Sequence, residues 1–255
     1  MQLTEAPASG TLDDLITLLR GKRLVALTGA GCSTESGIPD YRSPGGIWSK
    51  MRPIEFGDFL ASAEARRETW RRKFASHEVL QKATPNAGHR ALARLVEQGK
   101  MIAVVTQNID GLHQVSGVPD DKVIELHGNA TYAACLDCRR RYELEWVREI
   151  FAVDERLPLC TGCGGMIKTA TISFGQSMPE AEMQRAQEVT LAADLFIVLG
   201  SSLVVYPAAG FPIMAKRNGS RLAIVNREPT EQDELADIVI NAEIGATMSR
   251  AVGVN

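Results

Sequence analysis

The sequence predicts an α/β protein whose strands form a parallel sheet covered by helices on both faces. Short, wholly apolar runs alternate with longer amphipathic stretches, and glycines or polar residues follow several of the apolar runs. Strands buried on both faces of a parallel sheet are apolar throughout, and the connections between them are usually helical. Two Cys-x-x-Cys pairs between two of the predicted strands indicate a smaller, metal-stabilised insertion.

The predicted elements follow one another along the whole chain. Residues 11–14 have the pattern of a helix start, and the apolar face that follows stops at Gly21. Residues 49–98 are expected to be largely helical with an interruption near Pro85, after which a helix extends to about residue 97. Wholly apolar or nearly apolar runs predict strands at residues 24–27, 101–106, 123–126, 195–199, 221–225 and 238–240.

Composition excludes several classes of protein. The 255 residues are 45% hydrophobic and 23% charged, which is ordinary for a globular protein. A net charge of −3 gives no general electrostatic reason to bind nucleic acid. No apolar window reaches the roughly 18 residues of a membrane span, and the N-terminus lacks a secretion pattern. We therefore expect a cytoplasmic protein without nucleic-acid or membrane partners, in an oligomeric state that the sequence does not indicate.

The four paired cysteines predict a zinc site. Cys135-x-x-Cys138 and Cys160-x-x-Cys163 are separated by 21 residues, and two such pairs can present four thiolates tetrahedrally to Zn²⁺. Four thiolates leave no open coordination position, so the metal is expected to stabilise structure. A disulfide pair or a redox-active pair are the alternatives. The fifth cysteine, Cys32, is expected to be a small buried residue.

Polar clusters follow the strands where a ligand crevice is expected. Gly29-Ala30-Gly31 comes after the first strand and suits a turn that approaches a pyrophosphate. The third glycine and the ribose-binding carboxylate of a dehydrogenase fingerprint are missing, which disfavours an ordinary dehydrogenase. Carboxyl ends of parallel strands meet at one edge, so we expect a shared site there for the polar residues at 106–110, 200–202 and Asn226.

His127 is the best candidate for a general base. It follows the third strand and precedes a glycine, so it is expected in the crevice. His89 and His113 fall in predicted helices, and His77 has no recognisable setting.

In this order, the motifs resemble the sirtuin family, the NAD-dependent protein lysine deacylases. The resemblance covers nearly the whole chain beyond Gly21. Residues 33–42, with Trp70 and Phe74 upstream of Pro85, look most like the branch of the type-four sirtuins and their bacterial relatives. The matching stretches are 29–42, 85–89, 107–113, 126–128, both cysteine pairs, 174–175, 200–203 and 225–226.

The resemblance implies a Rossmann-like, doubly wound parallel sheet with a small zinc-ribbon and helical domain. The NAD-binding domain would comprise residues 1–48, 84–130 and 172–255. A helical insertion at 49–83 and a zinc-ribbon insertion at 131–171 would together form the small domain. NAD and an acyl-lysine protein or peptide would meet in the cleft between the two domains.

The resemblance also implies a role for individual residues. His127 would be the general base, with Asn108 and Asp110 holding nicotinamide and its ribose as part of the catalytic set. Cys135, Cys138, Cys160 and Cys163 would bind Zn²⁺. The substrate peptide would add as a strand between Phe174, Gly175 and Gln176 on one side and Leu203, Val204 and Val205 on the other. NAD would contact Gly29, Ala30, Gly31, Glu35, Asp40, Tyr41, Arg42, Trp48, Gln107, Asn108, Ile109, Asp110, His127, Gly200, Ser201, Ser202, Asn226 and Ile244.

The implied reaction transfers an acyl group, most simply acetyl, from lysine to ADP-ribose and releases nicotinamide. Mono-ADP-ribosyl transfer at the same site and a catalytically idle NAD-sensing scaffold are the alternatives. Gln176 replaces an acid of many relatives, so the peptide preference stays open. No Tyr-x-x-Arg pair precedes Pro85, which disfavours desuccinylation, although Arg71 and Arg72 leave acidic acyl chains possible.

Overall fold

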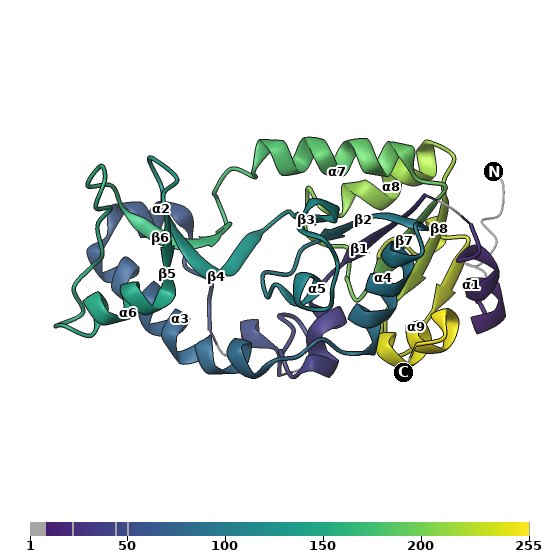
Figure 1. Cartoon of the computed structure of the whole chain (residues 1–255), viewed down its shortest axis with the longest axis horizontal. Helices are drawn as coiled ribbons and strands as arrows, with labels where there is room; N and C mark the ends of the chain where they lie inside the picture. The colour runs from purple at the N-terminus through teal and green to yellow at the C-terminus, as the bar shows by residue number, and fades with distance from the viewer. Residues whose placement is uncertain (1–8, 22, 44, 50, 255) are drawn as a thin grey trace.

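The computed structural model describes residues 9–21, 23–43, 45–49 and 51–254. Its strands form a six-stranded parallel sheet in the order β3-β2-β1-β7-β8-β9 and a three-stranded antiparallel sheet in the order β5-β4-β6. The two sheets lie toward opposite ends of the long axis of the molecule (Figure 1). The predicted α/β fold with a parallel sheet and a smaller insertion is confirmed.

The parallel sheet contains all six predicted strands. The first strand extends one residue further than expected and the third ends one residue earlier. The chain moves outward from β1 to β2 and β3, then returns to the other side of β1 with β7. This reversal creates the crevice at which doubly wound sheets bind ligands. The strands are β1 (Leu24–Thr28), β2 (Met101–Thr106), β3 (Val123–Glu125), β7 (Leu195–Leu199), β8 (Arg221–Val225) and β9 (Ile238–Ile240).

Helices cover both faces of this sheet because alternate strand residues belong to different cores. Leu24 and Ala26 of β1 pack in a core with α1, α4 and α9, whereas Val25 and Leu27 pack in a core with α7 and α8. Successive side chains of a strand point to opposite faces, so a strand covered on both sides is wholly apolar. The helices are α1 (Leu12–Leu18), α4 (Ala87–Glu97), α7 (Glu180–Ala192), α8 (Gly210–Arg217) and α9 (Ile244–Val252).

The smaller sheet packs with helices α3 and α6 around a separate core, and α2 packs against α3. Trp70, Tyr142 and Val147 are buried there together with two of the paired cysteines. This region contains α2 (Phe56–Ala61), α3 (Ala63–Lys82), β4 (Gly128–Cys135), β5 (Arg141–Glu143), α6 (Leu144–Phe151) and β6 (Ile167–Thr171). The remaining elements are α5 (Leu112–Val115) and the 3₁₀ turns η1 (Ala30–Ser36), η2 (Ile47–Ser49), η3 (Asp120–Lys122) and η4 (Asp233–Leu235).

The helical stretch expected from residue 49 begins later than predicted. Residues 51–55 are not helical, and the first α-helix after them starts at Phe56. Pro53 disfavours helical backbone in the residue before it, which explains the extended segment. Ser62 then separates α2 from α3, because its side chain accepts a hydrogen bond from the backbone N–H of Ala65 at 3.2 Å and caps the second helix.

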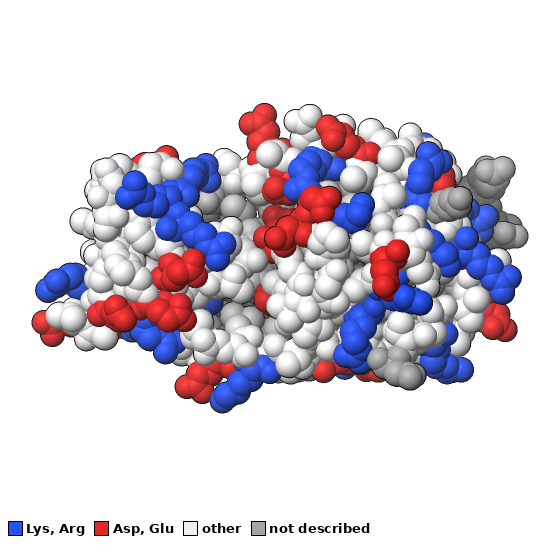
Figure 2. Space-filling model, viewed as in Figure 1, with Lys and Arg blue, Asp and Glu red and all other residues white. Residues whose placement is uncertain are grey.

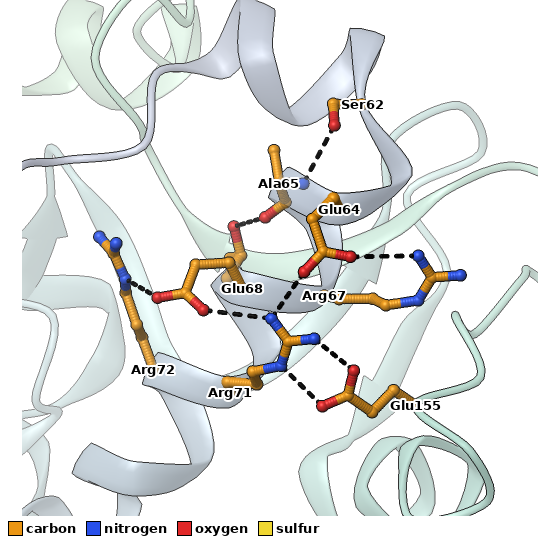
Figure 3. Close-up of polar contacts among 9 residues, drawn as sticks. Ser62, Glu64, Ala65, Arg67, Glu68, Arg71, Arg72 and Glu155 are labelled. Atoms are coloured by element: carbon orange, nitrogen blue, oxygen red, sulfur yellow. Dashed lines mark hydrogen bonds and ion pairs between the residues drawn. The ribbon is translucent and has the colours of Figure 1, made fainter.

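Ion pairs connect α3 to the segment that follows α6. The Arg71 guanidinium bonds Glu64 on its own helix at 2.7 Å and Glu155 from the distant segment through its Nε at 2.6 Å (Figure 3). Water and salt screen exposed pairs of this kind, so we expect them to add little to the stability of the fold. Figure 3 also shows the contact between Arg72 and Glu68. The Arg72 Nε donates to the Glu68 carboxylate at 2.7 Å.

Among the residues that the structure describes, no helix is both long and apolar enough to cross a membrane. Acidic and basic side chains are interspersed over the face shown in Figure 2. This mixture agrees with the small net charge of −3.

Candidate active site and metal centre

A cavity of about 660 Å³ lies beside the carboxyl ends of β1, β2, β7 and β8. Its other walls come from the segment before α2, from α2 and α3, and from residues that follow β6. Most of the predicted site residues line it. They are Gly29, Ala30, Gly31, Asp40, Tyr41, Arg42, Gln107, Asn108, Ile109, His127, Phe174, Gly175, Gln176, Gly200, Ser201, Ser202, Val205, Asn226 and Ile244.

Glycines allow two segments to cross tightly at the cavity floor. A Cβ atom at Gly29 would lie 2.6 Å from the Gly200 carbonyl oxygen, and one at Gly31 would lie 2.9 Å from the Gly200 Cα. Gly200 itself has φ of 67°, a backbone conformation that side chains rarely adopt. Close backbone contact with Gly200 therefore fixes the shape of the Gly29-Ala30-Gly31 turn.

Asn108 is fixed at the end of β2 by contacts to the first turn. Its side-chain nitrogen donates to the Gly29 carbonyl at 3.0 Å and to the Ser33 hydroxyl at 3.1 Å. Ser33 in turn donates to a carboxylate oxygen of Asp110 at 2.7 Å, and the other Asp110 oxygen accepts the N–H of Leu112. Asp110 is not among the lining residues, but this network places it directly behind Asn108.

His127 is half-buried in the cavity wall and is held in one tautomer. Its Nδ1 lies 3.0 Å from the backbone carbonyl of Gln107. A carbonyl oxygen only accepts, so Nδ1 carries the hydrogen and Nε2 keeps a lone pair. Burial lowers the pKa of His127, and the Gln107 carbonyl only partly offsets this effect. The imidazole is therefore neutral near pH 7 and able to accept a proton.

Polar side chains follow several strand ends at the cavity, and two of them are joined by a hydrogen bond. The Gln107 side-chain nitrogen donates to the Ser201 hydroxyl at 2.8 Å, which links β2 to β7. Asn226, after β8, donates to the Glu228 carbonyl at 2.7 Å. Amides and hydroxyls at these positions suit the hydroxyls and phosphate oxygens of a nucleotide.

The loop after η1 is shaped by Asp40. Its carboxylate accepts the N–H groups of Arg42 and Ser43 and the Ser43 hydroxyl, so Asp40 organises the turn that brings Tyr41 to the cavity. Burial, with a smaller effect of the Asp110 charge, raises the pKa of Tyr41. The predicted contact of the Trp48 side chain lies outside what the structure describes.

Glu35 is the predicted cofactor-binding residue whose setting differs most from expectation. It is not among the lining residues; its carboxylate accepts the backbone N–H of Gly245 at 2.7 Å. Gly245 lies in the first turn of α9, where a negative charge is favourable. Glu35 thus holds the start of the helix that brings Ile244 to the cavity.

The expected peptide-binding segments lie on the rim of the cavity. Phe174 is 46% exposed and Val204 is 38% exposed, although Val204 is not a lining residue. Leu203 is buried with φ of 57°, and its N–H donates to the Ser201 hydroxyl at 3.3 Å. Gln176 lines the cavity, and its side-chain oxygen accepts the N–H of Ser173.

One wall of the cavity and the buried contacts of Ser33 were not predicted from the sequence. Ser33 joins Asn108 to Asp110, and its place two residues after the glycine turn could have suggested this contact. The wall opposite the sheet has no such signal because tertiary packing alone brings it to the cavity. Its residues are Met51, Arg52, Pro53, Ile54, Phe59, Thr69 and Arg72.

The four paired cysteines converge at the edge of the smaller sheet. Their sulfur atoms all lie within 4.8 Å of one another, and the Cys135–Cys163 and Cys138–Cys160 sulfurs are 3.5 Å apart. Tetrahedral zinc–thiolate bonds of about 2.3 Å require sulfurs about 3.8 Å apart. The cluster therefore fits a zinc ion with four protein ligands, and the structure contains free cysteines at these positions, not disulfides.

The sequence matches the model of the Sir2 family over residues 29–207. A protein of Bradyrhizobium diazoefficiens named NAD-dependent protein deacetylase 1 is 60% identical over 242 residues, which cover 95% of this chain and 94% of that protein. An NAD-dependent protein deacetylase of Rhodopseudomonas palustris is 57% identical over 242 residues, with 95% of each chain covered.

Solved structures agree with the sequence matches. A structure described as Sir2 with a p53 peptide and NAD⁺ has a TM-score of 0.86 at 37% identity, covering 96% of this chain and 98% of that chain. A Sir2 variant with a deacetylated p53 peptide and 3′-O-acetyl ADP ribose has a TM-score of 0.85 at 36% identity, covering 96% of this chain and 100% of that chain. By sequence and by fold, this chain belongs to the Sir2 family.

Proposed function

We propose that this protein is an NAD-dependent protein lysine deacetylase. The observation that carries the proposal is the setting of His127, a neutral imidazole with a free Nε2 in the wall of the cavity that Asn108 also lines. Relatives at 60% and 57% identity bear the name of this activity. A base beside a nucleotide-sized cavity supports transfer chemistry better than NAD sensing alone.

The cavity fits NAD by its polarity and by the glycines of its floor. Side chains at Gly29 or Gly31 would collide with the Gly200 backbone, so glycine is required where these two segments meet beside the cavity. When bound, NAD supplies an ADP-ribose group that accepts the acyl group as nicotinamide leaves. The residues proposed to hold it are Gly29, Ala30, Gly31, Asp40, Tyr41, Arg42, Trp48, Gln107, Asn108, Ile109, Asp110, His127, Gly200, Ser201, Ser202, Asn226 and Ile244, with Glu35 acting through the start of α9.

Asn108, Asp110 and His127 are proposed to have different roles in the reaction. The carboxamide of Asn108 and the carboxylate of Asp110 bind and orient the nicotinamide end, because Ser33 locks both side chains in place. Nε2 of His127 takes a proton from a ribose hydroxyl, and the Gln107 carbonyl keeps the opposite nitrogen protonated throughout. Ile54 and Phe59 line the wall opposite the sheet and would exclude water from the reacting centre.

The substrate is proposed to be an acyl-lysine segment of a protein, bound as an extended strand. Phe174, Gly175 and Gln176 would flank one side of it, and Leu203, Val204 and Val205 the other. The exposure of Phe174 and Val204 supports an apolar rim for such a peptide. Gln176 is neutral, so we expect little preference for a basic residue beside the acyl-lysine.

Acetyl is the expected acyl group. Arg72 lines the cavity, but its guanidinium donates to Glu68 at 2.7 Å and to the Arg52 carbonyl at 2.7 Å. Arg71 pairs with Glu64 and Glu155. Because both arginines already have acceptors, a carboxylate-bearing acyl chain gains little by binding near them.

The paired cysteines are proposed to hold structural Zn²⁺ in a small domain of residues 49–83 and 131–171. The NAD-binding domain would then comprise residues 1–48, 84–130 and 172–255. The core around Trp70 is separate from the two cores that flank the parallel sheet, which supports this division. Thiolate ligands of this kind stay reduced in the cytoplasm, where we propose that the enzyme acts.

Product analysis tests the proposal. Zinc-loaded protein is incubated with NAD and an acetyl-lysine peptide, and the products are separated by mass. Equal amounts of nicotinamide, free lysine peptide and O-acetyl-ADP-ribose are expected. ADP-ribose attached to protein would instead identify a mono-ADP-ribosyltransferase, and no NAD turnover would leave only an NAD-sensing scaffold.

A further inference from the structure

A buried hydrogen-bond relay leads from helix α5 to the main chain of Asn108. The Asn108 N–H donates to the Thr106 hydroxyl at 3.0 Å, and the Thr28 hydroxyl donates to the same oxygen at 2.8 Å. Thr28 lies 2.9 Å from Nε2 of His113. All four residues are buried, with His113 only 1% exposed. The relay therefore connects three separate segments, β1, β2 and α5, in the interior of the protein.

The hydrogens of the relay fix the tautomer of His113. The Thr28 hydroxyl has a single hydrogen, which it gives to Thr106, so Nε2 of His113 must donate to Thr28. Nδ1 of His113 then carries no hydrogen while the ring is neutral. Burial, with a smaller effect of His89, lowers the pKa of His113 to about 3 and keeps it neutral.

His89 is the neighbour of this relay. Its ring centroid lies 5.0 Å from that of His113, and its Nδ1 accepts the N–H of Asn86 at 3.3 Å. Nε2 of His89 and Nδ1 of His113 have no hydrogen-bond partner among the residues that the structure describes. In the neutral rings, Nε2 of His89 is a donor and Nδ1 of His113 is an acceptor, so the two histidines complement each other.

Packing alone does not account for His113. A buried polar atom without a partner costs free energy, and an apolar side chain of similar size would fill the same space without this cost. What an apolar side chain cannot supply is the hydrogen bond to Thr28. The hydrogen bond to Thr28 therefore explains why a histidine occupies this buried position.

We propose that His113, through Thr28 and Thr106, positions Asn108 for the nicotinamide end of NAD. The side chain of Asn108 is already held by Gly29 and Ser33, and the relay fixes its main chain from the opposite side. His113 is a positioning residue, since it is not among the cavity-lining residues. This inference rests on the proposed function and adds a determinant of NAD affinity to it.

Three variants separate the relay from general packing. Thr28→Val removes the hydroxyl with little change in volume, and His113→Leu removes the ring donor. His113→Gln retains an amide N–H that can reach Thr28 and should restore function. Thr190→Val is the matched control, because Thr190 is equally buried and loses one hydroxyl contact, to the Ala186 carbonyl, within α7.

The readouts are NAD affinity by calorimetry, KM for NAD and for acetylated peptide, and nicotinamide inhibition. Thr28→Val and His113→Leu should weaken NAD binding and nicotinamide inhibition about tenfold, the effect of one buried hydrogen bond, with peptide KM unchanged. His113→Gln should recover to within about threefold, and Thr190→Val should bind NAD like the parent even if it melts earlier.

Two results would overturn the relay. Folded Thr28→Val with parental NAD affinity would show that Asn108 does not depend on it. If Thr28→Val and Thr190→Val both raised the KM for NAD and the KM for peptide to the same extent, the cause would be general destabilisation. If His113→Leu fails to fold, Thr28→Val still decides the question. Absence of NAD binding by the parent protein would instead refute the proposed function itself.

Discussion

The metal centre and the nucleotide cavity are built in opposite ways. The four cysteines come from two short motifs with 21 residues between them, and their sulfurs converge within 4.8 Å beside a small core. The cavity draws on four strand ends spread from Thr28 to Val225, joined by contacts such as Gln107 to Ser201. A local site depends on the stability of one small region. A distributed site depends on the positions of side chains within an already stable sheet.

A substitution of His127 should have the largest effect, and it should change catalysis without changing stability. His127→Asn should lower deacetylation by about a thousandfold, because an amide can donate to the Gln107 carbonyl but cannot accept a proton at neutral pH. Zinc content and the melting temperature should stay unchanged, since the cavity side chain supports no core. Rates from product analysis and melting curves on the same sample check this. Turnover near the parental rate would exclude His127 as the base.

Removal of a cysteine ligand should lower zinc content and stability, which the His127 substitution leaves unchanged. Cys135→Ala should reduce zinc content and lower the free energy of unfolding by about 4 kcal/mol, because metal binding is linked to folding of the smaller sheet. Zinc analysis and denaturant unfolding provide the measurement. Cys32→Ala is the matched control: Cys32 is also buried but outside the cluster, so this variant should retain its zinc. Unchanged stability of zinc-free protein would contradict a structural metal.

A smaller effect is expected at Tyr142, which contacts the metal centre from its own core. Its hydroxyl donates to the Cys160 sulfur at 3.1 Å and accepts the Thr161 N–H at 2.9 Å. Tyr142→Phe should weaken zinc binding about tenfold, as measured by competition with a coloured chelator. Thr161→Val keeps the N–H and the sulfur contact, so its zinc affinity should stay close to that of the parent. Equal affinities for all three proteins would show that the sulfur contact does not matter.

The smallest effect is expected at Glu35, which supports the cavity only through the start of α9. Glu35→Gln removes the charge at the start of α9 but retains an oxygen for the Gly245 N–H, so NAD affinity should fall only about threefold. Calorimetric titration with NAD measures this. A loss of a hundredfold would mean that Glu35 contacts NAD directly. Thr11→Ala, which removes the cap of α1 instead, should leave NAD affinity unchanged.

The sequence was sufficient for the sheet and for the metal centre. Wholly apolar runs such as residues 195–199 located strands to within one residue, because burial on both faces leaves no room for polar side chains. The cysteine spacing predicted the ligand set for a similar reason: zinc constrains residue type and local spacing together. The helix prediction from residue 49 did not take account of Pro53, which disfavours helical backbone in the residue before it.

Side-chain direction and tertiary contact were harder to predict. The motif around Glu35 identified the segment but not that its carboxylate holds α9, and Asp110 lies behind Asn108 instead of in the lining. Arg72 and Thr69 belong to a helix in the other part of the molecule, and their approach to the cavity depends on how two cores pack together. No pattern within one segment encodes such a contact.

Titration of the zinc-loaded protein with NAD, in the presence of acetylated peptide, tests most directly whether these distant strand ends form one nucleotide site. We expect saturable binding of one NAD per chain. Asn108→Ala, Ser201→Ala and Asn226→Ala, which remove side chains after β2, β7 and β8, should each weaken it. No heat of binding from the parent protein, or variants that bind as tightly as the parent, would contradict this expectation.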